Sequence, residues 1–132
     1  MRRVALGLLL AATLAVAGCA ASCAPGQRAM RSEWLYFGTA MPQGRVSPED
    51  WRGFVDAVVT PRFPDGLTVW PAQGQWKSAD GAIVREASWV LNIVHAPDAA
   101  SETAIAGIVD AYKTRFGQES VLRVGNDACA SF

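Results

Sequence analysis

Tyr36 and Glu86 are the side chains of this sequence that could serve as a general acid and a general base. Both lie in runs with the pattern of strands, where a phenol and a carboxylate can be held beside a bound molecule. Alternation along the strands predicts that they share one sheet face with further aromatic and hydrogen-bonding residues: Trp34, Thr68, Trp70, Ser88, Asn92 and Arg123. Such a mixture suits the floor of a small-molecule site. The alternative is a self-complementary dimer interface without a ligand.

Charged residues in stiff or apolar surroundings form a second candidate group: Arg62, Asp65, Glu86, Arg115 and Glu119. In one interpretation an arginine presents its planar guanidinium to an anion or a carboxylate, and a neighbouring acid orients it. In the other, the arginines pair with these acids and only tie the fold together. The candidate ligand-binding residues are therefore the following: Trp34, Tyr36, Arg62, Trp70, Glu86, Asn92 and Arg115.

His95 is the one histidine of the sequence and stands at the end of a strand-like run, before Pro97. A lone general base needs an orienting partner and a nucleophile, and the sequence signals neither. His95 is therefore interpreted as a strand-end residue. The sequence has no clustered cysteines and histidines, no glycine-rich phosphate loop and no nucleophile elbow. We expect no metal and no cofactor.

The segment 60–68 positions the candidate residues, because it ends a helix and starts a strand within a few residues. Pro61 and Pro64 fix their own φ and push the residue before each of them out of helical geometry. Ser47 and Pro48 predict the start of the first helix. That helix has the apolar stripe Trp51, Phe54, Val55 and Val58. A second helix is predicted from Ser101, with the stripe Ile105, Ile108, Val109, Tyr112 and Phe116 and Gly117 as its C-terminal cap.

Strands are predicted at residues 32–37, 67–77, 83–95 and 120–124, with a turn at 125–127 before the tail. Pro71 and Gly74 favour an edge strand with a bulge for the second of them, and Asp80-Gly81 predicts a hairpin turn. The order βαββαβ predicts an α+β fold, the ferredoxin-like split βαβ sandwich, with an antiparallel sheet and both helices on one face. We expect the first and third strands at its centre, parallel to each other.

The start of the chain has the features of a secretion signal. Met1-Arg2-Arg3 is a basic head, and the apolar run that follows is shorter than the roughly 20 residues that span a membrane. The run ends in Val16-Ala17-Gly18-Cys19, which resembles the lipobox of bacterial lipoproteins. We expect a signal peptide at residues 1–18, a lipidated Cys19 with a tether at 19–30, and a single domain at 31–132. The alternative is ordinary cleavage near Ala17 or Ala20, which would release a soluble periplasmic protein.

A lipidated chain would be tethered to a membrane in the periplasm. Ala20 follows the cysteine, where an aspartate would favour inner-membrane retention, so the outer membrane is favoured and the inner membrane stays open. Without Arg2 and Arg3 the chain has ten basic and twelve acidic side chains, so nucleic acid is not expected as a partner. Cys23 and Cys129 are left either as a disulfide or as two unpaired thiols, because sequence does not show whether the termini meet.

Several segments together resemble a known family. These are Leu35-Tyr36-Phe37-Gly38, the segment 60–68, Gly74-Gln75-Trp76, Arg85-Glu86 and the segment 112–121. The sequence resembles the uncharacterised bacterial exported family known as domain of unknown function 3574 over residues 34–124. The resemblance implies an exported domain of this size, and it implies no activity and no catalytic residues.

Two functions follow as hypotheses. The first is a membrane-tethered binding module that holds a small ligand or a protein on its open sheet face, as a homodimer. The second is a small-molecule enzyme of the dimeric α+β-barrel type with Tyr36 and Glu86 as its acid and base. A structural role in the cell envelope is a third reading.

Overall fold

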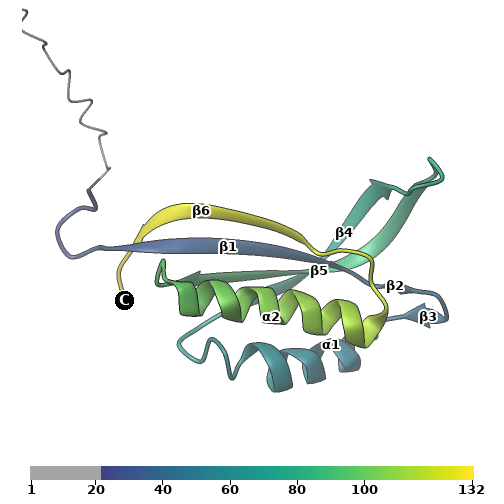
Figure 1. The fold of residues 1–132 in the computed structure, drawn as a ribbon, viewed down its shortest axis with the longest axis horizontal. Helices are drawn as coiled ribbons and strands as arrows, with labels where there is room; N and C mark the ends of the chain where they lie inside the picture. The colour runs from purple at the N-terminus through teal and green to yellow at the C-terminus, as the bar shows by residue number, and fades with distance from the viewer. Residues whose placement is uncertain (1–21) are drawn as a thin grey trace, which may run out of the picture.

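The computed structural model describes residues 22–132, so the expected signal peptide and Cys19 lie outside the described residues. The predicted α+β class is confirmed by a four-stranded antiparallel sheet, two main helices and a small second hairpin (Figure 1). In chain order the elements are β1 (Arg28–Gly38), β2 (Ala40–Met41), β3 (Gly44–Arg45), α1 (Pro48–Phe54), a π-helical turn (Val55–Val59), β4 (Thr68–Lys77), β5 (Ile83–His95), α2 (Ala99–Phe116) and β6 (Leu122–Ala130).

The main sheet has the strand order β4-β5-β1-β6, with β1 and β5 at its centre as predicted. These two strands are antiparallel, from Arg31 opposite His95 to Gly38 opposite Ser88, so the expected parallel arrangement is wrong. The reason is topological. The α1 crossover returns the chain to β4 in the direction of β1, and the β4–β5 hairpin then places β5 between them in the opposite direction.

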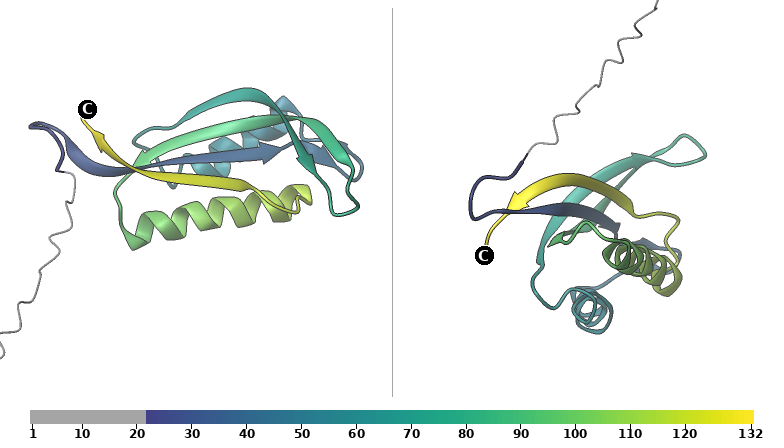
Figure 2. Two further views of the ribbon diagram at one scale, coloured as in Figure 1. Left: turned by 90° about the horizontal axis from the view of Figure 1, so that it is seen from above. Right: turned by 60° about the vertical axis from the view of Figure 1, so that its left-hand side comes forward.

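Both helices cover the same face of the sheet and leave the other face open (Figure 2). Helix α1 begins as predicted, because the Ser47 hydroxyl accepts a hydrogen bond from the Asp50 amide and the Asp50 carboxylate accepts one from the Ser47 amide. Helix α2 begins two residues before the predicted Ser101. Asp98 caps it by accepting a hydrogen bond from the Ser101 amide at 2.7 Å. Gly117 ends α2 in the left-handed conformation, as the sequence predicts.

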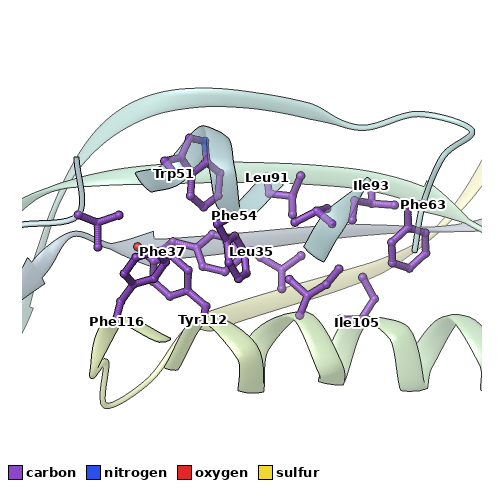
Figure 3. Close-up of a cluster of buried hydrophobic side chains, with 13 residues drawn as sticks. Leu35, Phe37, Trp51, Phe54, Phe63, Leu91, Ile93, Ile105, Tyr112 and Phe116 are labelled. Carbon is purple, nitrogen blue, oxygen red and sulfur yellow. The ribbon is translucent and has the colours of Figure 1, made fainter. Parts of the chain in front are cut away.

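The core lies between the helices and the central strands and is largely aromatic (Figure 3). The predicted stripes are its centre: Trp51 and Phe54 from α1 and Tyr112 from α2 are buried against Phe37 of β1. Trp51 also stacks on Trp89 of β5, with ring centroids 5.5 Å apart. On this face of β5 Leu91 and Ile93 are buried and Trp89 is partly buried, whereas Ala87 is exposed.

Strand β4 lies at the sheet edge, as its proline indicates, but it has no bulge. Its register with β5 is continuous from Thr68 opposite Asn92 to Lys77 opposite Ile83. The edge position alone accommodates Pro71, because one side of an edge strand needs no ladder hydrogen bonds. The predicted bulge is therefore wrong, whereas the hairpin turn at Asp80-Gly81 is present, with the Ser78 amide bonded to the Ala82 carbonyl.

Strands β1 and β6 are both longer than predicted. They pair from Arg28 opposite Ala130 to Tyr36 opposite Leu122, so residues 125–127 lie in the strand and form no turn. Gly125 is needed there because a Cβ atom would lie 2.6 Å from a carboxylate oxygen of Glu33. Beyond this pairing, a disulfide joins Cys23 to Cys129 and ties the two ends of the described chain together.

A charged cluster lies on the helix side of β1 and β6, around the fully buried carboxylate of Glu33. Arg123 donates two hydrogen bonds to it at 2.8 Å, and Arg31 donates one at 2.7 Å. Glu102 of α2 accepts from Arg123 as well. The pKa of Glu33 is lowered to about 2, chiefly by the hydrogen bonds from Arg123 and against the effect of burial. Arg123 is thus on the helix side and not on the open face where the sequence placed it.

Within residues 22–132 no helix is long and apolar enough to cross a membrane.

Candidate ligand-binding site

Glu86 stands on the open face of β5, at the point where β1 leaves the sheet. After Gly38 the chain turns away into the β2–β3 hairpin, and the amide of Ala40 loses its place in the ladder. One carboxylate oxygen of Glu86 accepts that amide at 2.7 Å, and the other accepts the indole N–H of Trp76 at 2.8 Å. Two neutral donors from different strands thus fix the carboxylate.

Gly38 provides the space in which this carboxylate lies. A Cβ atom on Gly38 would stand 2.8 Å from one oxygen of Glu86 and 3.0 Å from the other. On the opposite side of the same backbone, the hydroxyl of Tyr112 donates to the Gly38 carbonyl at 2.8 Å. The pKa of Tyr112 is raised, mainly by burial and further by the negative charge of Glu86. The position of Glu86 is therefore set by a glycine that the helix side holds in place.

A cavity of about 570 Å³ opens beside Glu86, within the size range of small-molecule sites. The sheet forms its floor with Tyr36, Glu86, Ser88 and Trp76. Two loops form its walls, one at Met41 and Pro42 and the other at the end of α2, residues 117–120. The side-chain amide of Gln118 donates to the Ala40 carbonyl and so joins the two walls.

Among residues 22–132, the charged residues that line this cavity are both acids, Glu86 and Glu119. In the described part of the chain, no ion pair involves the Glu86 carboxylate. Arg45 and Arg85 border a smaller neighbouring cavity of about 420 Å³, which Glu86 also lines. The larger cavity therefore has a negative, hydrogen-bonded carboxylate among apolar and aromatic groups.

The candidates of the open face fall into two groups. Tyr36 and Glu86 line the cavity, as the sequence analysis anticipates for a shared face. Trp34 and Trp70 lie further along the sheet, where their rings meet edge to face with centroids 5.4 Å apart. Asn92 is close to them and donates to the Ser32 hydroxyl and the Glu33 carbonyl, so its amide holds β1 to β5.

The structure does not bring the five charged candidates together. Arg62 and Asp65 line a third cavity of about 670 Å³ at the opposite end of β5, beside His95. Arg62 donates to the Val58 carbonyl at 2.7 Å, and the guanidinium of Arg115 covers the ring of Phe116 at 5.2 Å. Neither arginine has a salt bridge to Asp65, Glu86 or Glu119 among the described residues.

His95 is a buried strand-end residue, as predicted. Its Nδ1 lies 2.7 Å from the Ala96 carbonyl, an acceptor only, so Nδ1 carries the proton. Its Nε2 is buried without a hydrogen-bond partner in the structure. In residues 22–132 there is also no group of three side chains that could hold a metal ion.

Most residues of the cavity carry no functional signal in the sequence. Trp76 was assigned to an edge strand and to the family resemblance, Met41 was no candidate, and Glu119 was the one candidate from the loop after α2. One feature of the sequence could have pointed to the site: two glycines, Gly38 and Gly74, lie in strands on either side of the strand that carries Glu86. Gly74 pairs directly opposite Glu86, so two glycines flank one carboxylate, but only the strand register reveals that arrangement.

The fold and the cavity define a small α+β domain with an open, partly acidic sheet face. The chain belongs to the family described as "Protein of unknown function (DUF3574)", whose model matches residues 32–132. The resemblance in the sequence is thereby confirmed. No curated protein matches the sequence.

Three solved structures share the fold at low sequence identity. A phage SAM lyase in complex with S-methyl-5'-thioadenosine is 13% identical, with a TM-score of 0.60, and the match covers 87% of this chain and 97% of that chain. The apo state of a phage SAM lyase is 17% identical, with a TM-score of 0.52 and coverage of 81% and 91%. CutA from Synechococcus elongatus is 10% identical, with a TM-score of 0.52 and coverage of 78% and 80%.

Proposed function

We infer that the chain is an exported, membrane-tethered domain that binds a small molecule in the cavity beside Glu86. The observation that carries this inference is the Glu86 carboxylate, which two neutral donors hold at the cavity and which has no ion pair in the described chain. A carboxylate that only joined β1 to the hairpin would not need an adjoining cavity with an aromatic floor. The ferredoxin-like split βαβ assignment belongs to the same proposal and is supported by the strand order and by the solved structures.

The tether is inferred from the start of the chain. The signal-like residues 1–18 and the lipobox-like end at Cys19 support a lipoprotein in the periplasm, anchored to the outer or the inner membrane. The disulfide between Cys23 and Cys129 supports the same compartment, because such bonds persist in oxidising surroundings. It also leaves Cys19 as the remaining cysteine of the three.

The open face supports a homodimer. Tyr36, Leu122 and Val124 are large apolar side chains with exposures of 38%, 60% and 41%, and they lie close together on β1 and β6. A second copy of the chain that covered these residues would also close the cavity, because Tyr36 and Leu122 line it. Replacing Val124 with aspartate should then convert the dimer to a monomer in analytical ultracentrifugation, and an unchanged mass would exclude this face as the interface.

A native mass spectrum tests the binding proposal. The mature chain with Cys19→Ser would be purified from a periplasm, so that the disulfide stays intact and no lipid is attached. We expect additional mass that disappears in Glu86→Gln. The matched control is Asp65→Asn, which removes a carboxylate from the third cavity and should leave the extra mass in place. Identical clean spectra, combined with no binding in a broad ligand screen, would reject the proposal.

The alternative function is a small-molecule enzyme, and one observation favours it. Tyr36 and Glu86 line the same cavity, and the phage SAM lyase has the same fold. Incubation with SAM, followed by chromatography, tests this alternative directly. Turnover that is lost in both Tyr36→Phe and Glu86→Gln, with the fold retained in circular dichroism, would support an enzyme. If SAM stays unchanged, the proposal of a lyase-like activity is rejected.

A further inference from the structure

The cavity beside Glu86 also indicates the chemical class of its ligand, and this step rests on the proposed binding function. We propose that the cavity binds a small organic cation with an apolar body, in which an ammonium or a similar centre pairs with the Glu86 carboxylate. The charges of the lining residues are the first argument. The charged lining residues are Glu86 and Glu119, and no lysine or arginine of the described chain lines this cavity. An anionic ligand would therefore meet two like charges and no counter-charge.

The hydrogen bonds of Glu86 are the second argument. Its two known donors, the Ala40 amide and the Trp76 indole, are both neutral, so the charge of the carboxylate is not compensated by either of them. A carboxylate accepts about four hydrogen bonds, so acceptor capacity remains for a ligand. A cationic donor gives the stronger, charge-assisted bond.

The aromatic groups are the third argument. Trp76 and Tyr36 line the cavity and are 42% and 38% exposed, so a ligand can contact both side chains. A cation over such a face is attracted by the negative charge density of the ring, most strongly for tryptophan. The hydrogen bond from the Trp76 indole to Glu86 keeps the ring and the carboxylate in one site. Apolar side chains at Met41, Pro42, Ala72 and Leu122 remain for the body of the ligand.

Arg45 and Arg85 are the opposing charges nearby. They line the smaller cavity together with Glu86, but neither forms an ion pair with it among the described residues. Both are exposed, so water and salt screen their effect. Within residues 22–132 no group of three side chains could hold a metal ion, which also favours an organic cation over a metal ion.

Calorimetric titration with three probes that share one aromatic ring tests this proposal. The probes are phenethylammonium, 2-phenylethanol and phenylacetate, added at up to millimolar concentration to the mature chain with Cys19→Ser. We expect phenethylammonium to bind about tenfold or more tightly than 2-phenylethanol, since a hydrogen bond between two charged groups is stronger than one from a neutral donor. Phenylacetate should bind most weakly.

Two comparisons connect this preference to the site. Glu86→Gln should abolish the difference between phenethylammonium and 2-phenylethanol, whereas Asp65→Asn should preserve it. Added salt should lower the affinity of the unaltered chain for phenethylammonium more than its affinity for 2-phenylethanol. This comparison tests the proposal even if Glu86→Gln does not fold. Equal affinities for all three probes, or strongest binding of phenylacetate, would overturn the cation proposal and leave the binding function standing. No heat with any probe would overturn the cation proposal as well, and extra mass in the native spectrum would then still support binding.

Discussion

The carboxylate of Glu86 occupies the space that a side chain on Gly38 would need. The distance from an ideal Cβ on Gly38 to the nearer carboxylate oxygen is 2.8 Å, which is shorter than atoms in these positions normally approach. Gly38 also ends β1, and its carbonyl accepts the hydroxyl of the buried Tyr112. The residue that ends the central strand therefore also determines where the charge of the cavity lies.

Gly38→Ala should displace the Glu86 carboxylate, because the new methyl group and the oxygens cannot both fit. We expect ligand binding to fall about as far as in Glu86→Gln, since the carboxylate loses its bond to the Ala40 amide. The measurement is the affinity for phenethylammonium. Gly53→Ala in α1 is the matched control, because Gly53 does not line the cavity and the new Cβ would meet only the Arg115 guanidinium at 3.9 Å. Equal losses in the two variants would show that the proximity of Gly38 and Glu86 has no role.

Glu33 should stabilise the fold above its unfolded pKa and cease to do so in acid. Its pKa is lowered from 4.5 to about 2 in the folded chain, so folding favours the ionised form. The stabilisation, about 3 kcal/mol, is present above the unfolded pKa of 4.5 and disappears as the pH falls towards 2. Urea unfolding of Glu33→Gln should show this loss at pH 7 and a much smaller difference near pH 2.

The control for Glu33 is Glu49→Gln, which removes an exposed carboxylate that pairs with Arg52 at the surface. Its effect should stay within about 0.5 kcal/mol at either pH, because exposed ion pairs contribute little. A pH-independent loss in Glu33→Gln would mean that the buried position needs the shape of the side chain and not its charge.

The disulfide between Cys23 and Cys129 should be a major contributor to stability. The two cysteines are 106 residues apart, so the bridge restricts nearly the whole unfolded chain. In the chain-entropy model a disulfide that closes a loop of this length stabilises the folded state by about 4 to 5 kcal/mol. We expect dithiothreitol to lower the free energy of unfolding by about 2 to 5 kcal/mol. The double variant Cys23→Ser, Cys129→Ser should have the same low free energy of unfolding as the reduced chain, and the reductant should not change it. A reduced chain as stable as the oxidised one would contradict this prediction.

Cys19 should carry the lipid, because the structure uses the other two cysteines in the disulfide. Cells grown with a fatty-acid probe should label the unaltered chain, and Cys19→Ala should remove the label and release the protein from the membrane fraction. Cys129→Ser provides the control, since it breaks the disulfide and should retain the label. Labelling of Cys19→Ala would refute the anchor.

The sequence predicted the elements well wherever a local signal was present. Ser47 and Asp50 cap α1, Gly117 ends α2, and Asp80-Gly81 forms the hairpin turn. It failed where the determining contact is distant. The strand β6 continues through Gly125 because this residue faces Glu33 on β1, and a local reading of the segment indicates only a turn. The relative direction of β1 and β5 likewise depends on the whole topology.

The sequence by itself determined the class of fold, the two amphipathic helices and the presence of Tyr36 and Glu86 on one face. Each of these depends on residues close together in the chain, through periodicity, caps and alternation. Only the tertiary structure decided which candidates form a site. Glu86 and Trp76 meet because the β4–β5 hairpin places them side by side, and Arg62 lies at the far end of β5 because the crossover ends there. These contacts depend on the strand register and on the route of the chain between the strands. Neither can be predicted from residues that are neighbours in the sequence.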